Sequence, residues 1–224
     1  MSGNEIQYLS DSLTVERVYA LAQAGDSAAI DAFFTGRGED NAVINAWVNV
    51  QRDVNNVKGD PRASALIGWR GVEFCVAKDY KLPAAMMLHN IVSFFMPNFD
   101  KGVSPADVPT ILEAAQRQTI LRRQIRKEGP LMWALWDEGL AHLSAGDAGQ
   151  AVRFLEEGAE LARKNADHDG EAWCNIFIGK TKAKYRPAER EEGLAMMQAA
   201  AAVIREVGED WEKESVEGIL GSVK

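Results

Sequence analysis

The chain has 224 residues, of which 46% are hydrophobic and 26% charged, so it is long enough to bury a core without a disulfide or a metal. Its formal net charge of −8 argues against general nucleic-acid binding, which needs a basic surface that displaces counterions from phosphates. The most apolar stretch, 82–96, is too short to span a bilayer, and the N-terminus lacks the basic and apolar regions of a signal peptide, so we expect a cytoplasmic protein with no membrane or nucleic-acid partner.

Helical periodicity dominates the sequence, and strand signals are nearly absent. One phrase occurs twice, as AGDSAAIDAFF at 24–34 and as AGDAGQAVRFL at 145–155. In each copy the glycine suits the left-handed turn that ends one helix, and the aspartate suits the cap that begins the next. The phrase therefore predicts the turn of a helical hairpin.

Glycine, proline and capping residues divide the remaining chain into further helices. In chain order, the predicted helices cover about 14–24, 26–34, 41–57, 61–79, 83–96, 104–127, 131–145, 148–165, 170–184, 187–207 and 209–220. A break is expected at Gly129-Pro130, and the longest loop at 97–107.

Paired off, these helices give hairpins at 41–79, 83–127, 130–165 and 169–207, with lengths near those of helical-repeat units. Such hairpins cannot bury their apolar faces alone, so stacking them into a solenoid is favoured. We expect one helical-repeat domain over 1–224, with a possible subdivision into 1–100 and 104–224. An irregular globular helical bundle remains the alternative.

The stretch 132–164 carries small residues at regular spacings on both helices of its hairpin. These are Gly139, Gly146-Asp147, Ala151 and Gly158, with Leu155 between the last two. In this pattern the stretch resembles a tetratricopeptide repeat, which implies an all-α, right-handed solenoid that holds peptides in a groove lined by the first helix of each pair. The match departs from the family pattern at Glu138, His142 and Arg163.

No catalytic signature is present, and the three histidines are scattered. The run NADHDG at 165–170 resembles the start of a calcium loop, but Ile176 stands where the closing Glu is needed, so its aspartates are predicted to cap a helix. We expect His142 to pack inside a hairpin, and Cys75 and Cys174 to be buried free thiols. No metal, cofactor or enzymatic activity is predicted.

Two basic clusters, 117–127 and 180–190, each carry five positive charges. Their side chains are either solvated near helix ends, where cations oppose the helix dipole, or they line one groove that binds an acidic or carboxylate-bearing partner. In the second case Arg122 and Arg126 share one helix face, as do Lys180 and Lys184. Three tryptophans fit either a core or binding anchors. The candidate binding residues are Arg122, Arg126, Asn175, Lys180, Lys184, Trp133, Trp136 and Trp173.

These features predict a non-enzymatic protein–protein interaction module, a scaffold that binds a peptide or a partner segment, acidic in character, in a groove between stacked helices. The alternative is a small-molecule or anion sensor that uses the basic faces at 117–127 and 180–190. The N-terminal helix pair is rich in Phe and Ala with little polar cover, which also predicts a homodimer through that end.

Overall fold

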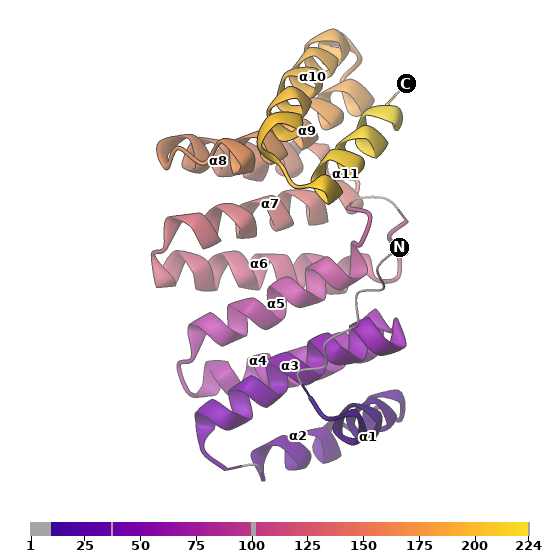
Figure 1. Ribbon diagram of the computed structural model, residues 1–224, viewed down its shortest axis with the longest axis vertical. Coiled ribbons are helices and arrows are strands. Elements are labelled where there is room, and N and C mark those ends of the chain that lie inside the picture. Colours follow the sequence, from indigo (N-terminus) through magenta and orange to yellow (C-terminus); the bar gives the residue numbers. More distant parts are fainter. Residues whose placement is uncertain (1–9, 37, 100–101, 224) are drawn as a thin grey trace. The chain divides into compact units, whose positions relative to one another are not determined.

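The computed structural model describes residues 10–36, 38–99 and 102–223. Within these ranges the chain forms eleven α-helices and one short 3₁₀ turn, with no strand, so the predicted all-α fold is confirmed (Figure 1). Helices pack mainly on their neighbours in sequence, as they do in helical solenoids and bundles. None of the described helices combines the length and the apolar character that a bilayer span requires. The contacts divide the chain into two compact units, 1–97 and 98–224.

Five helices form the first unit: α1 (Ser12–Gln23), α2 (Ser27–Thr35), α3 (Asp40–Lys58), α4 (Pro61–Ala77) and α5 (Lys81–Phe95). The last three lie side by side and pack pairwise, while α1 contacts α2, α3 and α4 (Figure 1). Trp47 lies in the core of this unit, where its ring stacks on that of Phe34 with the centroids 3.7 Å apart.

Six α-helices and the 3₁₀ turn form the second unit: α6 (Val108–Ile125), α7 (Glu128–Ser144), α8 (Ala148–Lys164), α9 (His168–Tyr185), η1 (Pro187–Glu189), α10 (Arg190–Val207) and α11 (Asp210–Gly221). The break predicted at Gly129-Pro130 is wrong by a few residues, because α6 ends at Ile125 and α7 has already begun. Pro130 lies in the first turn of α7, where a helix does not use the missing N–H.

The repeated Ala-Gly-Asp phrase forms a turn between helices at both places. Gly25 and Gly146 have φ angles of 67° and 78°, a left-handed conformation that costs glycine no steric clash. The side chains of Asp26 and Asp147 each accept a hydrogen bond from the backbone N–H three residues later, at 2.9 and 3.0 Å. The predicted hairpin turn is therefore confirmed between α1 and α2 and between α7 and α8.

Small residues let α8 approach both of its neighbours. A Cβ on Gly139 of α7 would lie 2.6 Å from Cγ of Leu155, closer than real Cβ contacts come. A Cβ on Gly158 of α8 would lie 3.1 Å from Sγ of Cys174 in α9. Protein interiors are close-packed, so Gly139 leaves no room for a methyl group and Gly158 leaves very little. Gly139 and Gly158, two of the small residues in 132–164, therefore lie where α8 comes closest to its neighbours.

Helices α9 and α10 also approach each other closely, at glycines that lie outside that pattern. A Cβ on Gly193 would lie 2.5 Å from the carbonyl oxygen of Gly179 and 2.7 Å from the backbone nitrogen of Ala183. A Cβ on Gly179 would in turn meet the carbonyl oxygen of Gly193 at 2.6 Å. The two backbones therefore touch directly where these helices cross.

Three side chains that could have carried chemistry are buried in the interior. His142 stacks on Phe154 with ring centroids 5.3 Å apart, as expected for a side chain inside a hairpin, and burial lowers its pKa. Cys75 and Cys174 are buried free thiols, as predicted. Burial raises the pKa of both, to about 11 for Cys75, so both thiols stay protonated at neutral pH and are poor nucleophiles.

Candidate functional site

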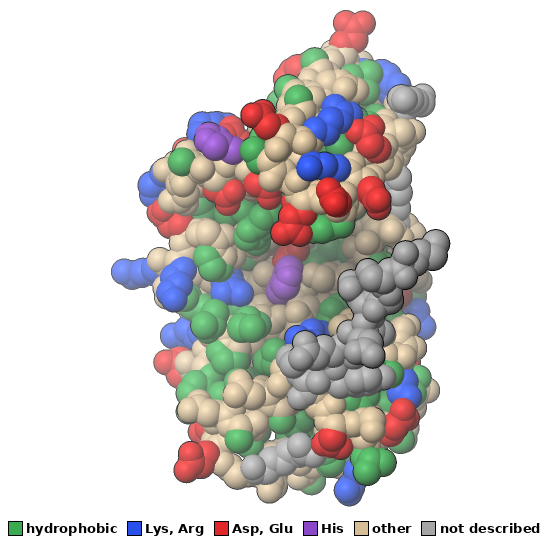
Figure 2. Space-filling model, viewed as in Figure 1, with side chains coloured by type: hydrophobic (Ala, Val, Ile, Leu, Met, Phe, Trp, Pro, Cys, Tyr) green, Lys and Arg blue, Asp and Glu red, His purple; other side chains and the backbone are tan. Residues whose placement is uncertain are grey.

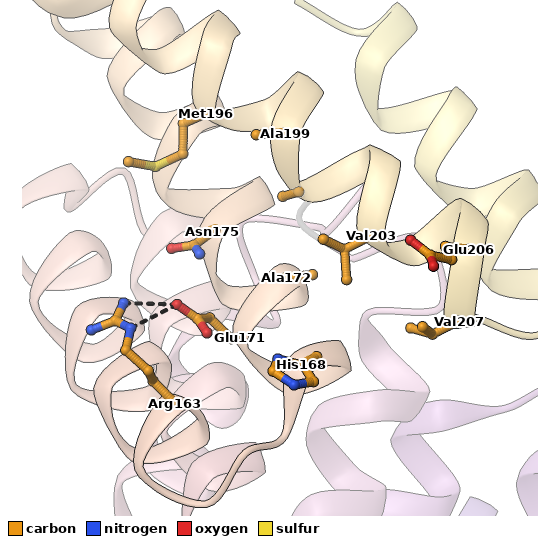
Figure 3. A pocket seen from close by; sticks show the side chains of 11 residues that line it. Arg163, His168, Glu171, Ala172, Asn175, Met196, Ala199, Val203, Glu206 and Val207 are labelled. Atoms are coloured by element: carbon orange, nitrogen blue, oxygen red, sulfur yellow. Dashed lines mark hydrogen bonds and ion pairs between the residues drawn. The ribbon is translucent and has the colours of Figure 1, made fainter.

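A groove of about 640 Å³ opens between α9 and α10 in the second unit (Figure 3). This volume falls in the range of roughly 300–1,000 Å³ that is typical of ligand pockets. We call it the α9–α10 groove, and it is lined by Arg163, His168, Glu171, Ala172, Asn175, Met196, Ala199, Ala200, Val203, Glu206 and Val207.

The α10 side of the groove is an apolar stripe. Met196, Ala199, Val203 and Val207 are separated by three, four and four residues, so they lie on one face of the helix. From Met196 to Val207 the helix rises about 16 Å. Val207 is 56% exposed, and the side chains of Met196 and Val203 are only half-buried. The stripe has the spacing of a helix–helix seam, and the groove leaves it open to solvent.

The α9 side of the groove is polar. Asn175 is half-buried on the floor, where its amide can both donate and accept hydrogen bonds (Figure 3). Toward the end of α8, the guanidinium of Arg163 contacts Oε1 of Glu171 through both Nε and Nη2 at 2.8 Å. Arg163 is largely exposed, so this ion pair contributes little to stability and can rearrange around a ligand.

Aromatic side chains cluster on another face of α9. Phe99, in the loop before α6, contacts Trp136 of α7 and both Trp173 and Phe177 of α9. Trp136 also contacts Trp173 and Phe177, and the ring centroids of all these pairs lie between 5.4 and 6.3 Å apart. Trp133 packs edge-on against Trp136 at 5.8 Å. We call Trp136, Trp173 and Phe177 the aromatic socket, because their rings surround that of Phe99.

Helix α11 is attached to the same side of α9. The indole of Trp173 donates a hydrogen bond to Oε1 of Glu212 at 2.8 Å, and its ring stacks on Trp211 with centroids 6.2 Å apart. The other oxygen of Glu212 accepts from the backbone N–H of Glu209 at 2.7 Å, which caps α11. One carboxylate therefore both caps α11 and holds it against α9.

The acidic turn 165–170 begins α9. The side chain of Asp167 accepts a hydrogen bond from the N–H of Gly170 at 2.9 Å, so it caps the helix as predicted. Asp169 lies inside the first turn and makes no cap. Burial, Glu212 and Asp167 together raise the pKa of Asp169 to about 6. Among the described residues, no three His, Cys, Asp or Glu side chains are placed to hold a metal ion.

The predicted basic residues have different surroundings. Arg122 and Lys180 are buried, 8% and 3% exposed, and Nζ of Lys180 lies 5.5 Å from the ring centre of Phe177. Burial lowers the pKa of Arg122, although nearby Asp137 opposes this. Arg126 is exposed and lies just after the end of α6, with φ of 58°. Lys184 is exposed at the end of α9.

The structure thus brings the three predicted tryptophans together, and it places Asn175 in the α9–α10 groove on a different face of α9. Sequence reasoning missed Phe99 and the apolar stripe of α10. The spacing of Met196, Val203 and Val207 could have identified the stripe. Phe99 lies in a loop, where no periodicity marks its position.

The sequence was also set against known proteins. No protein-family model matches the chain, and no curated protein shows significant similarity to it. The resemblance of 132–164 to a tetratricopeptide repeat therefore rests on the residues of that stretch alone.

Proposed function

We propose that the chain is a non-enzymatic protein–protein interaction module, which binds an amphipathic helical segment of a partner protein in the α9–α10 groove. The observation that carries the proposal is the open apolar stripe of α10 beside the polar floor of α9. The resemblance of 132–164 to a tetratricopeptide repeat adds support, since that family holds peptides between stacked helices.

A helix is the partner structure that suits the stripe. Amphipathic helices bind grooves through apolar residues at i, i+3 or i+4, and i+7, and Met196, Ala199 and Val203 have the same period. Covering a half-exposed side chain such as Val207 contributes about 1 kcal/mol. Three turns of helix would cover the whole stripe, while Asn175 could pair with a polar group at the edge of the partner.

Charge around the groove favours a partner with lysines or arginines on its polar side. Glu206 lines the groove without a cation beside it in the lining, and Glu171 is shared with Arg163. Acidic side chains also gather on the visible surface of α10 and α11, with fewer basic ones among them (Figure 2). The acidic partner expected from the sequence was predicted to bind the basic clusters 117–127 and 180–190. The α9–α10 groove favours a basic partner instead.

The test uses one variant inside the groove and one outside it. Val203→Glu places a charge in the middle of the stripe, and Ala202→Glu places the same charge on an exposed neighbouring position outside the groove. A displayed library of helical peptides is selected on the wild-type protein after depletion on the Val203→Glu variant. The selected peptides are then synthesised, and their affinities are measured by fluorescence anisotropy.

We expect peptides with an apolar stripe and basic residues, whose affinity falls at least tenfold with Val203→Glu and less than twofold with Ala202→Glu. Peptides that bind all three proteins equally, or a selection that yields none, would contradict the proposal. Circular dichroism checks that both variants fold. Light scattering adds one alternative outcome: a wild-type dimer that Val203→Glu converts to monomer would mean that a second copy of the chain fills the groove.

A further inference from the structure

The aromatic socket holds a side chain from outside the helices. The ring of Phe99 lies 5.8, 5.5 and 5.4 Å from those of Trp136, Trp173 and Phe177, measured between centroids. These walls come from α7 and α9, while Phe99 comes from the loop that precedes α6. The socket is therefore shaped to receive one six-membered aromatic ring from a separate segment.

The backbone at Phe99 is strained in this position. Its φ angle is 60°, in the left-handed region that bulky residues rarely adopt and glycine adopts freely. Strain of this kind persists only where surrounding contacts compensate for it, and it concentrates at ligand and switch sites. The contacts that hold Phe99 are those of its ring with the socket.

One wall of the socket, Trp136, also carries a hydrogen-bond donor that is left without an acceptor while Phe99 occupies the socket. Nε1 of Trp136 is buried and has no hydrogen-bond partner among the described residues. The neighbouring indoles differ, since Trp173 donates to Glu212 at 2.8 Å and Trp211 donates to Glu209 at 3.0 Å. Buried donors without an acceptor are uncommon and destabilising, so an occupant that offered an oxygen to Trp136 would have an advantage that a phenyl ring lacks.

We propose that the aromatic socket is a recognition site for the phenol ring of a tyrosine in a partner segment, and that Phe99 is its resident occupant. The partner's ring replaces that of Phe99, its hydroxyl oxygen accepts the hydrogen bond from Trp136, and the loop is released from its left-handed conformation. The α9–α10 groove uses other residues of α9, so this site is independent of it.

Phe99→Gly tests the proposal, because glycine accepts the local φ angle while it removes the ring. The probes are p-cresol, which is the small-molecule analogue of the tyrosine side chain, and toluene, which lacks the hydroxyl. Binding is followed by NMR titration of the indole N–H signals of the folded full-length protein. We expect p-cresol to bind Phe99→Gly at least fivefold more tightly than toluene, and the wild type at least tenfold more weakly than the variant.

The matched control is Trp136→Phe in the Phe99→Gly background, which keeps a ring and removes the donor. There the affinities for p-cresol and toluene should agree within twofold. Equal affinities of Phe99→Gly for p-cresol and toluene would show that the socket is only an apolar cavity, and would overturn the proposal. Equal binding of p-cresol to wild type and Phe99→Gly would do the same, since the binding site would then lie elsewhere.

A titration of the wild type covers the case in which Phe99→Gly does not fold. Saturating p-cresol should then shift the indole signal of Trp136, which Trp136→Phe identifies by its disappearance. An unchanged Trp136 signal in the wild-type protein overturns the proposal. Neither experiment involves Val203, so its outcome is separate from that of the α9–α10 groove.

Discussion

Asp169 is the residue whose ionisation bears most directly on stability. Its Oδ1 atom is buried and finds no hydrogen-bond partner in the described part of the chain, and burial, Glu212 and Asp167 raise its pKa to about 6. In an unfolded chain an aspartate has a pKa near 3.8. Between these two values the folded state binds a proton that the unfolded state does not, so the free energy of unfolding falls as pH rises through this interval.

Asp169→Asn should therefore stabilise the protein at pH 7.5 and make little difference near pH 4. At full strength two pKa units correspond to about 3 kcal/mol, and partial solvent screening reduces the expected gain to about 1 kcal/mol. Thermal unfolding at several pH values measures it. Glu160→Gln, at an exposed position on α8, is the control, and an equal gain at pH 4 and 7.5 for Asp169→Asn would show that the effect is not ionisation.

Residue patterns also show how far sequence reasoning could reach. The Gly-Asp hinges were predictable, because a left-handed glycine followed by a capping aspartate is a local signal. The burial of Arg122 and Lys180 was not, since a basic residue on a helix has the same sequence signature whether water or another helix faces it. Whether such a side chain is buried depends on tertiary packing alone.

At the scale of the helix pair, α9–α10 is sensitive to a single methyl group. Gly193→Ala would place Cβ 2.5 Å from the carbonyl oxygen of Gly179, and backbone atoms cannot move away as a flexible side chain can. We expect a loss of about 3 kcal/mol in the free energy of unfolding. Urea denaturation followed by circular dichroism measures the loss.

Gly218→Ala provides the matched control for this prediction. Gly218 is also helical, but nothing lies within 4 Å of a Cβ built there. Alanine at such a position favours the helix, so we expect a gain of about 0.5–1 kcal/mol. Similar stabilities for Gly193→Ala and the wild type would contradict the close crossing of α9 and α10.

The same pair of helices marks a limit of the sequence pattern. The small residues of 132–164 have the spacing of a repeat unit, and they predicted the packing of α7 against α8. Gly179 and Gly193 stand at no such spacing, so their contact became visible only when both helices were placed. The apolar stripe of α10 is an intermediate case. Its helical spacing can be read from the sequence, but its exposure to solvent cannot.

At the scale of the whole chain, the contacts divide the protein into two compact units, 1–97 and 98–224. A compact unit with its own core is expected to fold independently. We therefore expect a fragment covering 98–224 to be helical and to unfold in one cooperative thermal transition. A fragment that melts without cooperativity, while the intact chain melts sharply, would show that this unit depends on the rest of the protein.

Because two glycine backbones are in direct contact at one point, we expect the α9–α10 groove to widen along its length. Two helices that cross at an angle separate steadily with distance from their closest point. The crossing lies at Gly193, and the stripe runs away from it through Met196 and Val203 to Val207. If a partner helix binds this groove as proposed, we expect it to carry small side chains beside Met196 and progressively larger ones toward Val207.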